Sequence, residues 1–71
     1  MKLPVRVDGY LSRRASQMFP GALVYCDESG PVEVWSLRWG GQEPLGLGNC
    51  FNAAKQSVDA LIAAEKAKGT A

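Results

Sequence analysis

The sequence predicts an α+β domain with a small antiparallel sheet of three to four strands. One long C-terminal helix is expected to pack on one face of the sheet, and residues 11–18 are expected to form an additional short helix. Two observations carry this prediction: short segments in which apolar and polar side chains alternate, and an apolar stripe at helical spacing after residue 50. A chain of 71 residues makes one domain, residues 1–71.

The first strand is predicted in the opening segment LPVRVD, where every second side chain is apolar. Asp8-Gly9 ends this strand, and two continuations compete. Asp8-Gly9 forms a hairpin turn with YLSRR as the return strand, or residues 11–18 form a short helix that stops at Pro20-Gly21. We favour the helix because Ser, Arg, Ala, Gln and Met suit a helix better than a strand.

A β-hairpin is predicted in the segment ALVYC-DESG-PVEVWSLRW. A three-residue loop with Gly30 in the left-handed bulge position pairs Cys26 with Val32 and Val24 with Val34. One face of the hairpin then carries Ala22, Val24, Cys26, Val32, Val34, Ser36 and Arg38. The other face carries Leu23, Tyr25, Glu33, Trp35, Leu37 and Trp39, and we expect it to form the core, with Trp35 buried.

The C-terminal helix follows a turn at Gly40-Gly41 and a short predicted strand in LGLG, residues 45–48. Asn49 or Asn52 is expected to cap the helix, and Gly69 to close it. Its apolar stripe predicts which side faces the sheet. The stripe consists of Phe51, Ala54, Val58, Leu61 and Ile62.

This order of elements is similar in outline to the arm-binding domains of phage integrases and to several small RNA-binding domains. The resemblance covers the element order alone. No motif of these families is matched, so the resemblance implies no functional residue in this chain.

The residue types argue against catalysis and against a metal site. The chain has no histidine, which removes triads and imidazole bases. Cys26 and Cys50 stand apart without a histidine and predict no zinc site. Gly46-x-Gly48 before a helix is typical of a turn, although such a pair also precedes anion-binding loops. We therefore expect a protein that is not an enzyme and binds no cofactor.

The net charge and the hydropathy of the chain bear on its partner and its cellular location. The net charge of +1 neither requires nor excludes a nucleic-acid partner. No apolar run is long enough for a membrane span, and the first residues do not form a secretory signal. The sequence therefore predicts a cytoplasmic protein with reduced thiols and no membrane partner.

Two functional hypotheses follow. The first is a small interaction protein, of the kind that phages and mobile elements encode as accessories or inhibitors, which docks on a protein partner. The second is a nucleic-acid-binding module that uses arginines and stacks bases on Trp39 or Tyr25. The arginines of the second hypothesis are Arg6, Arg13, Arg14 and Arg38. The predicted binding residues are Arg13, Arg14, Arg38, Val34 and Trp39.

We also expect a homodimer, because one long helix cannot cover both faces of an apolar sheet. The predicted contact centres on Val24 and Val34, provided that the segment from Leu11 to Met18 does not lie over them. The surrounding residues would be Ala22, Cys26 and Val32.

Overall fold

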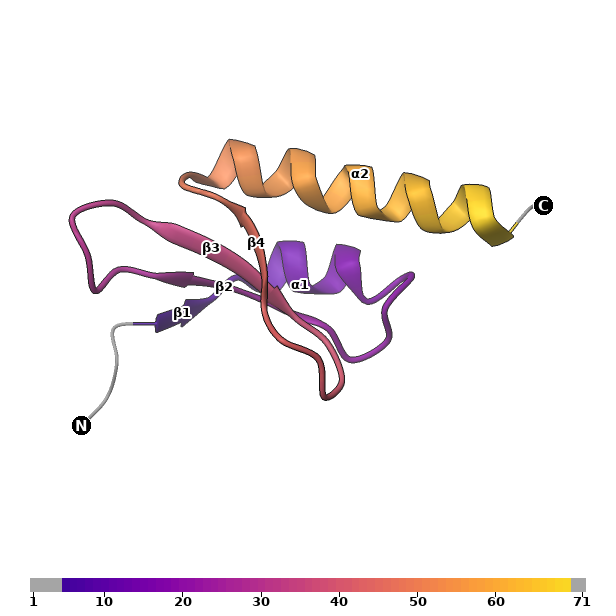
Figure 1. Ribbon diagram of the computed structural model, residues 1–71, viewed down its shortest axis with the longest axis horizontal. Coiled ribbons are helices and arrows are strands. Elements are labelled where there is room, and N and C mark those ends of the chain that lie inside the picture. Colours follow the sequence, from indigo (N-terminus) through magenta and orange to yellow (C-terminus); the bar gives the residue numbers. More distant parts are fainter. Residues whose placement is uncertain (1–4, 70–71) are drawn as a thin grey trace.

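The computed structural model describes residues 5–69 and confirms the α+β class (Figure 1). Four strands form one antiparallel sheet in the order β1-β2-β3-β4. The strands are β1 (Val5–Val7), β2 (Leu23–Asp27), β3 (Val34–Arg38) and β4 (Leu45–Gly48), and the helices are α1 (Gly9–Ala15) and α2 (Phe51–Gly69). The first residues of the predicted opening strand, Leu3 and Pro4, lie outside the described part of the chain.

Asp8 begins a helix and does not form a hairpin turn. Its Oδ1 atom accepts a hydrogen bond from the Leu11 N–H at 2.8 Å, which caps α1. The predicted short helix is thus confirmed, although it spans Gly9–Ala15 and not residues 11–18. The chain leaves the helix through a turn and enters β2 after Gly21, which has a φ of 85°.

The predicted register of the hairpin is wrong. Cys26 lies opposite Trp35 and Val24 lies opposite Leu37, so β3 is displaced by three residues from the predicted pairing. Six residues, 28–33, connect the two strands, and Gly30 has no positive φ. Because side chains alternate along a strand, an odd displacement exchanges the two faces of β3 relative to β2.

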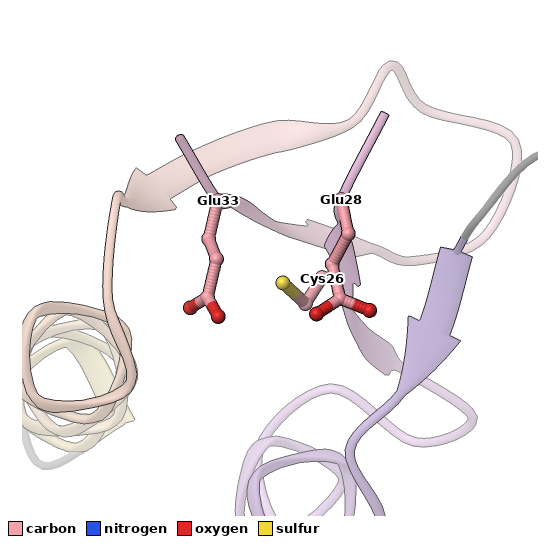
Figure 2. Close-up of side chains that lie close together, drawn as sticks. All are labelled: Cys26, Glu28 and Glu33. Carbon is pink, nitrogen blue, oxygen red and sulfur yellow. The ribbon is translucent and has the colours of Figure 1, made fainter. Parts of the chain in front are cut away.

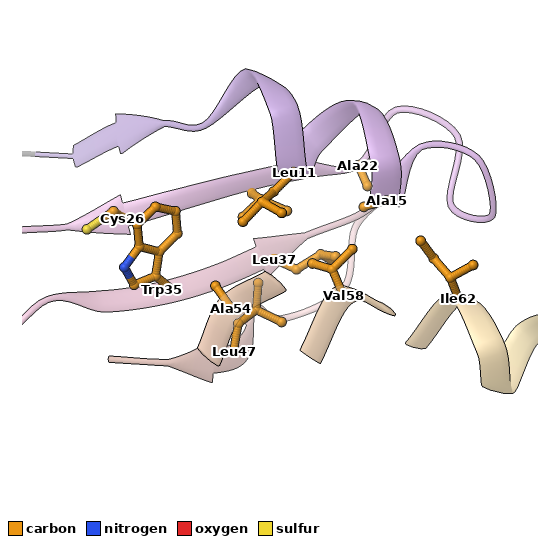
Figure 3. Close-up of a cluster of buried hydrophobic side chains, with 11 residues drawn as sticks. Leu11, Ala15, Ala22, Cys26, Trp35, Leu37, Leu47, Ala54, Val58 and Ile62 are labelled. Atoms are coloured by element: carbon orange, nitrogen blue, oxygen red, sulfur yellow. The ribbon is translucent and has the colours of Figure 1, made fainter. Parts of the chain in front are cut away.

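The core lies between one face of the sheet and both helices. Figure 3 shows side chains of α1, α2 and the sheet gathered in one cluster. Trp35 is only 2% exposed, which confirms its predicted burial. The buried apolar residues are Leu11 and Ala15 in α1, Ala54, Val58 and Ile62 in α2, and Ala22, Val24, Cys26, Trp35, Leu37 and Leu47 along the sheet.

Ser12 joins α1 to the sheet at the point where β1 ends. The Val24 N–H donates to Ser12 Oγ at 2.8 Å, and Ser12 Oγ in turn donates to the Val24 carbonyl at 3.3 Å. The Asp8 N–H donates to the same carbonyl at 2.8 Å. The helix therefore supplies the hydrogen bonds that β2 would otherwise receive from a longer first strand.

The chain passes from β4 to α2 through a close backbone contact at Gly48. Gly48 has a φ of 140°, and a Cβ atom added there would lie 2.6 Å from the Cβ of Ala53. Cys50 takes the capping place predicted for Asn49 or Asn52, since its Sγ accepts from the Ala53 N–H at 3.5 Å. The helix ends at Gly69, as predicted, although this glycine is itself the last helical residue and lacks a positive φ.

Candidate interaction surface

The face of the sheet opposite the helices is the candidate functional surface, here called the open face. The strands β1, β2 and β3 place alternate side chains on it in three rows across the sheet, and β4 contributes Gly46, which lies opposite Ser36. The rows are Val5, Asp27 and Val34; then Val7, Tyr25 and Ser36; then Leu23 and Arg38. No element within residues 5–69 packs over this face, since α1 and α2 both cover the other one.

Four aliphatic side chains on the open face are far from buried. Val5 is 40% exposed and Val7 is 53% exposed, while Leu23 and Val34 reach 47% and 49%. Tyr25 and Ser36 lie half-buried between them in the middle row. A single exposed apolar residue is ordinary, but four on one face of a sheet make that face a candidate interaction surface.

Opposite charges flank this apolar patch. Asp27 lies at one end of β2, and Arg38 lies on β3 at the other end of the sheet, opposite Leu23. Hydrogen bonding from Ser29 lowers the pKa of Asp27 below its ordinary value, so the carboxylate stays ionised at neutral pH. Within the described residues, Arg38 is exposed and forms no ion pair.

The four arginines of the nucleic-acid hypothesis do not gather on one surface. Arg14 lies on α1, donates from its Nε to Asp59 Oδ1 of α2 at 3.2 Å, and sits 5.9 Å from the Tyr10 ring centre. Its neighbour Arg13 is exposed on the same helix. These two are thus on the helical side of the molecule, whereas Arg38 belongs to the open face.

Arg6 is engaged at the sheet edge, where it approaches Glu28 to 4.0 Å. The Arg14–Asp59 pair holds α1 against α2, with Lys55 also 3.4 Å from Asp59. The hydrogen bond from Arg14 is the main cause that lowers the pKa of Asp59. Arg14 therefore has a structural role that the sequence did not indicate.

Trp39 also makes contacts within the protein. Its ring lies 4.9 Å from that of Phe19, and its Nε1–H donates to the Pro20 carbonyl at 3.0 Å. These contacts join the end of β3 to the loop between α1 and β2. Of the five predicted binding residues, only Val34 and Arg38 lie on the open face.

The predicted dimer contact around Val24 is wrong in its composition. Ala22, Val24 and Cys26 are buried under the helices because the register of β3 differs from the predicted one. Sequence reasoning missed Val5, Val7, Leu23 and Asp27 as members of the exposed surface. The signal was present in the polar residues of each strand, since Asp27 on β2 and Ser36 and Arg38 on β3 belong on one solvated face.

Among residues 5–69, a cluster of metal-ligating groups lies at the edge of the core, next to the loop between β2 and β3. Figure 2 shows the Cys26 thiol between the carboxylates of Glu28 and Glu33, and their ligand atoms lie within 4.8 Å of one another. Burial is the main cause that raises the pKa of Cys26, and both carboxylates add to it. Glu33 accepts a hydrogen bond from Trp35 Nε1–H at 3.0 Å. The raised pKa keeps the Cys26 thiol protonated at neutral pH.

Comparisons with known proteins add no assignment: no family model, no curated protein and no solved structure matches the chain. Among residues 5–69, neither helix combines the length and the apolar character that crossing a membrane requires.

Proposed function

We propose that this chain is a non-enzymatic interaction protein that binds another protein through the open face of its sheet. The observation that carries the proposal is the exposure, between 40% and 53%, of Val5, Val7, Leu23 and Val34 on one flat surface. Covering these side chains removes apolar surface from water, which is the dominant favourable contribution to most protein association. We also propose that the protein is an accessory protein of a phage or mobile element and that it acts in the cytoplasm.

A protein fits this surface better than a nucleic acid does. Binding to a phosphate backbone depends on several lysine or arginine side chains on one surface. Among residues 5–69, the open face carries a single arginine, Arg38, and the carboxylate of Asp27 opposes a polyanion. Tyr25 is the one aromatic residue on the face that bases could stack on.

A photo-crosslinking side chain at position 25 tests the proposal inside the cells that produce the protein. Tyr25 is replaced by p-benzoylphenylalanine, and the matched control carries the same group at Gln56, which is exposed on α2. We expect a covalent protein adduct from position 25 and none above background from position 56.

Three outcomes contradict the proposal. They are equal adducts from the two positions, the absence of any adduct, and retention of the purified protein on DNA that weakens steeply with salt and depends on Arg38.

A further inference from the structure

We infer that the partner on the open face is a second copy of this chain, packed face to face with its strands running in the opposite direction. This inference rests on the proposed function, because it names the protein that the same surface binds. Its basis is the charge pattern of the face, in which Asp27 and Arg38 stand at opposite ends with the aliphatic residues around and between them.

A two-fold axis decides which ends meet. Two faces packed against each other are related by an axis that lies in the plane of the contact. An axis parallel to the strands would bring Asp27 toward Asp27 of the partner subunit, which like charge disfavours. An axis perpendicular to the strands brings the Asp27 end of one copy onto the Arg38 end of the other. Asp27 and Arg38 lie on neighbouring strands, so they meet as a diagonal pair, and each dimer contains this pair twice because a two-fold contact is self-complementary.

The apolar rows fit the same arrangement. With the ends exchanged, the row of Val5 and Val34 faces the partner's row of Leu23, and the middle row with Val7 and Tyr25 faces its own copy. Two sheets packed in this way lie about 10 Å apart, with the strand directions about 30° from alignment. The helices would then form the two outer layers of a four-layer dimer.

The size of the face predicts a weak dimer. Strands of five residues at about 3.3 Å per residue, in a four-stranded sheet at about 4.8 Å spacing, give a face of about 17 by 19 Å. A standard stable interface buries about 800 Å² of accessible surface on each partner, which is more than this face alone supplies. The net charge of +1 on each copy opposes association little. We therefore expect a weak dimer, at the low end of the size range of specific interfaces.

Charge exchange tests the arrangement directly. In Arg38→Asp, the new carboxylate faces the partner's Asp27 twice in each dimer. In Asp27→Lys, the new ammonium faces the partner's Arg38 twice. We expect each variant to associate at least about tenfold more weakly than the wild type, because like charges are brought together. An equimolar mixture of the two variants should form a heterodimer, since both of its ion pairs are again of opposite sign.

Sedimentation equilibrium of the full chain, from about 10 µM to about 1 mM, covers the range in which interfaces of this size assemble. Circular dichroism establishes that each variant is folded before its association is compared, and Gln56→Glu on the exposed side of α2 is the control. A monomeric wild type at the highest concentration overturns the inference. So does a dimer that Arg38→Asp does not weaken, or a mixture of variants that remains monomeric.

The mass of the crosslinked adduct from position 25 separates this inference from the proposed function. An adduct of twice the chain mass supports both of them. An adduct with a different protein, with a monomeric wild type, overturns the second copy and keeps the proposed function. The absence of an adduct together with a monomeric wild type overturns both.

Discussion

Among the contacts between α1 and the sheet, we expect the one made by Ser12 to be the most sensitive to substitution. The variant Ser12→Ala tests this expectation. The hydroxyl accepts the Val24 N–H at 2.8 Å in a buried position. Its removal leaves that N–H without a partner, because Val24 faces α1 where β1 has already ended. The Val24 carbonyl keeps the hydrogen bond from the Asp8 N–H, so the loss concerns the donor alone.

The expected destabilisation follows from the cost of a buried, unsatisfied donor. Such a group costs about 1–3 kcal/mol, which is more than the net contribution of an ordinary hydrogen bond. For a domain of this length, each 1 kcal/mol lowers the melting temperature by about 4–8 °C. We therefore expect Ser12→Ala to lower the melting temperature by roughly 8–16 °C for a mid-range loss of about 2 kcal/mol.

Ser57→Ala is the matched control. Ser57 Oγ donates to the Leu47 carbonyl at 2.7 Å from a half-buried position, and water can take its place at that acceptor. We expect a loss of about 0.5–1.5 kcal/mol, as for an ordinary hydrogen bond. Urea and thermal unfolding, followed by the fluorescence of buried Trp35, measure both variants. If Ser12→Ala is no more damaging than Ser57→Ala, the reasoning about the orphaned donor is refuted.

Three further predictions concern the remaining parts of the fold. Gly48→Ala should destabilise the domain by about 1–3 kcal/mol in urea unfolding, because Gly48 has a positive φ and a Cβ atom there would meet Ala53 of α2. Gly46→Ala should be nearly neutral, because a Cβ atom at Gly46 has open space around it. Arg14→Gln should make the loss of stability in acid less steep. In the wild type, Arg14 lowers the pKa of Asp59, so the ionised carboxylate stabilises the fold above the ordinary pKa of Asp. This stability is lost as the pH falls through the lowered pKa. Equal urea midpoints of wild type and Arg14→Gln from about pH 7 to about pH 2 would contradict this. Trp35→Ala should cost about 3–5 kcal/mol and leave the chain unfolded by circular dichroism, and a folded variant with unchanged stability would show that the ring does not support the core.

The class of the fold could be predicted because its signals are local. The stripe at Ala54, Val58 and Ile62 indicates the side of α2 that faces the sheet, and all three residues are buried. The alternation around Val24 and Leu37 likewise indicates strands. The end of the first helix was less certain, because Ser16, Gln17 and Met18 suit a helix by propensity but form a turn before Pro20-Gly21.

The open face could not be predicted because it depends on register, which is not local. Six residues join β2 to β3, and a loop of that length allows several pairings. The predicted pairing placed Gly30 in a bulge position that it does not occupy. That difference of three residues moved Val24 from the expected surface into the core, while Leu23 moved from the core to the surface. The fold class does not change with this displacement, but the candidate site changes almost completely.

The two tryptophans four residues apart have different roles, and this difference bears on function. Trp35 lies within β3 on the core face, where its ring meets Phe51 at 5.7 Å. Trp39 follows the end of β3 and is held by Phe19 and by the carbonyl of Pro20. A stacking platform for bases needs aromatic faces that are free on one surface, and both indoles are engaged in contacts within the protein. In the nucleic-acid hypothesis Trp39 was one of two residues available for stacking, beside Tyr25, and Trp39 is engaged with Phe19 and Pro20. The open face combines exposed aliphatic side chains with one charge of each sign at its ends, and the proposal of a protein partner rests on that composition.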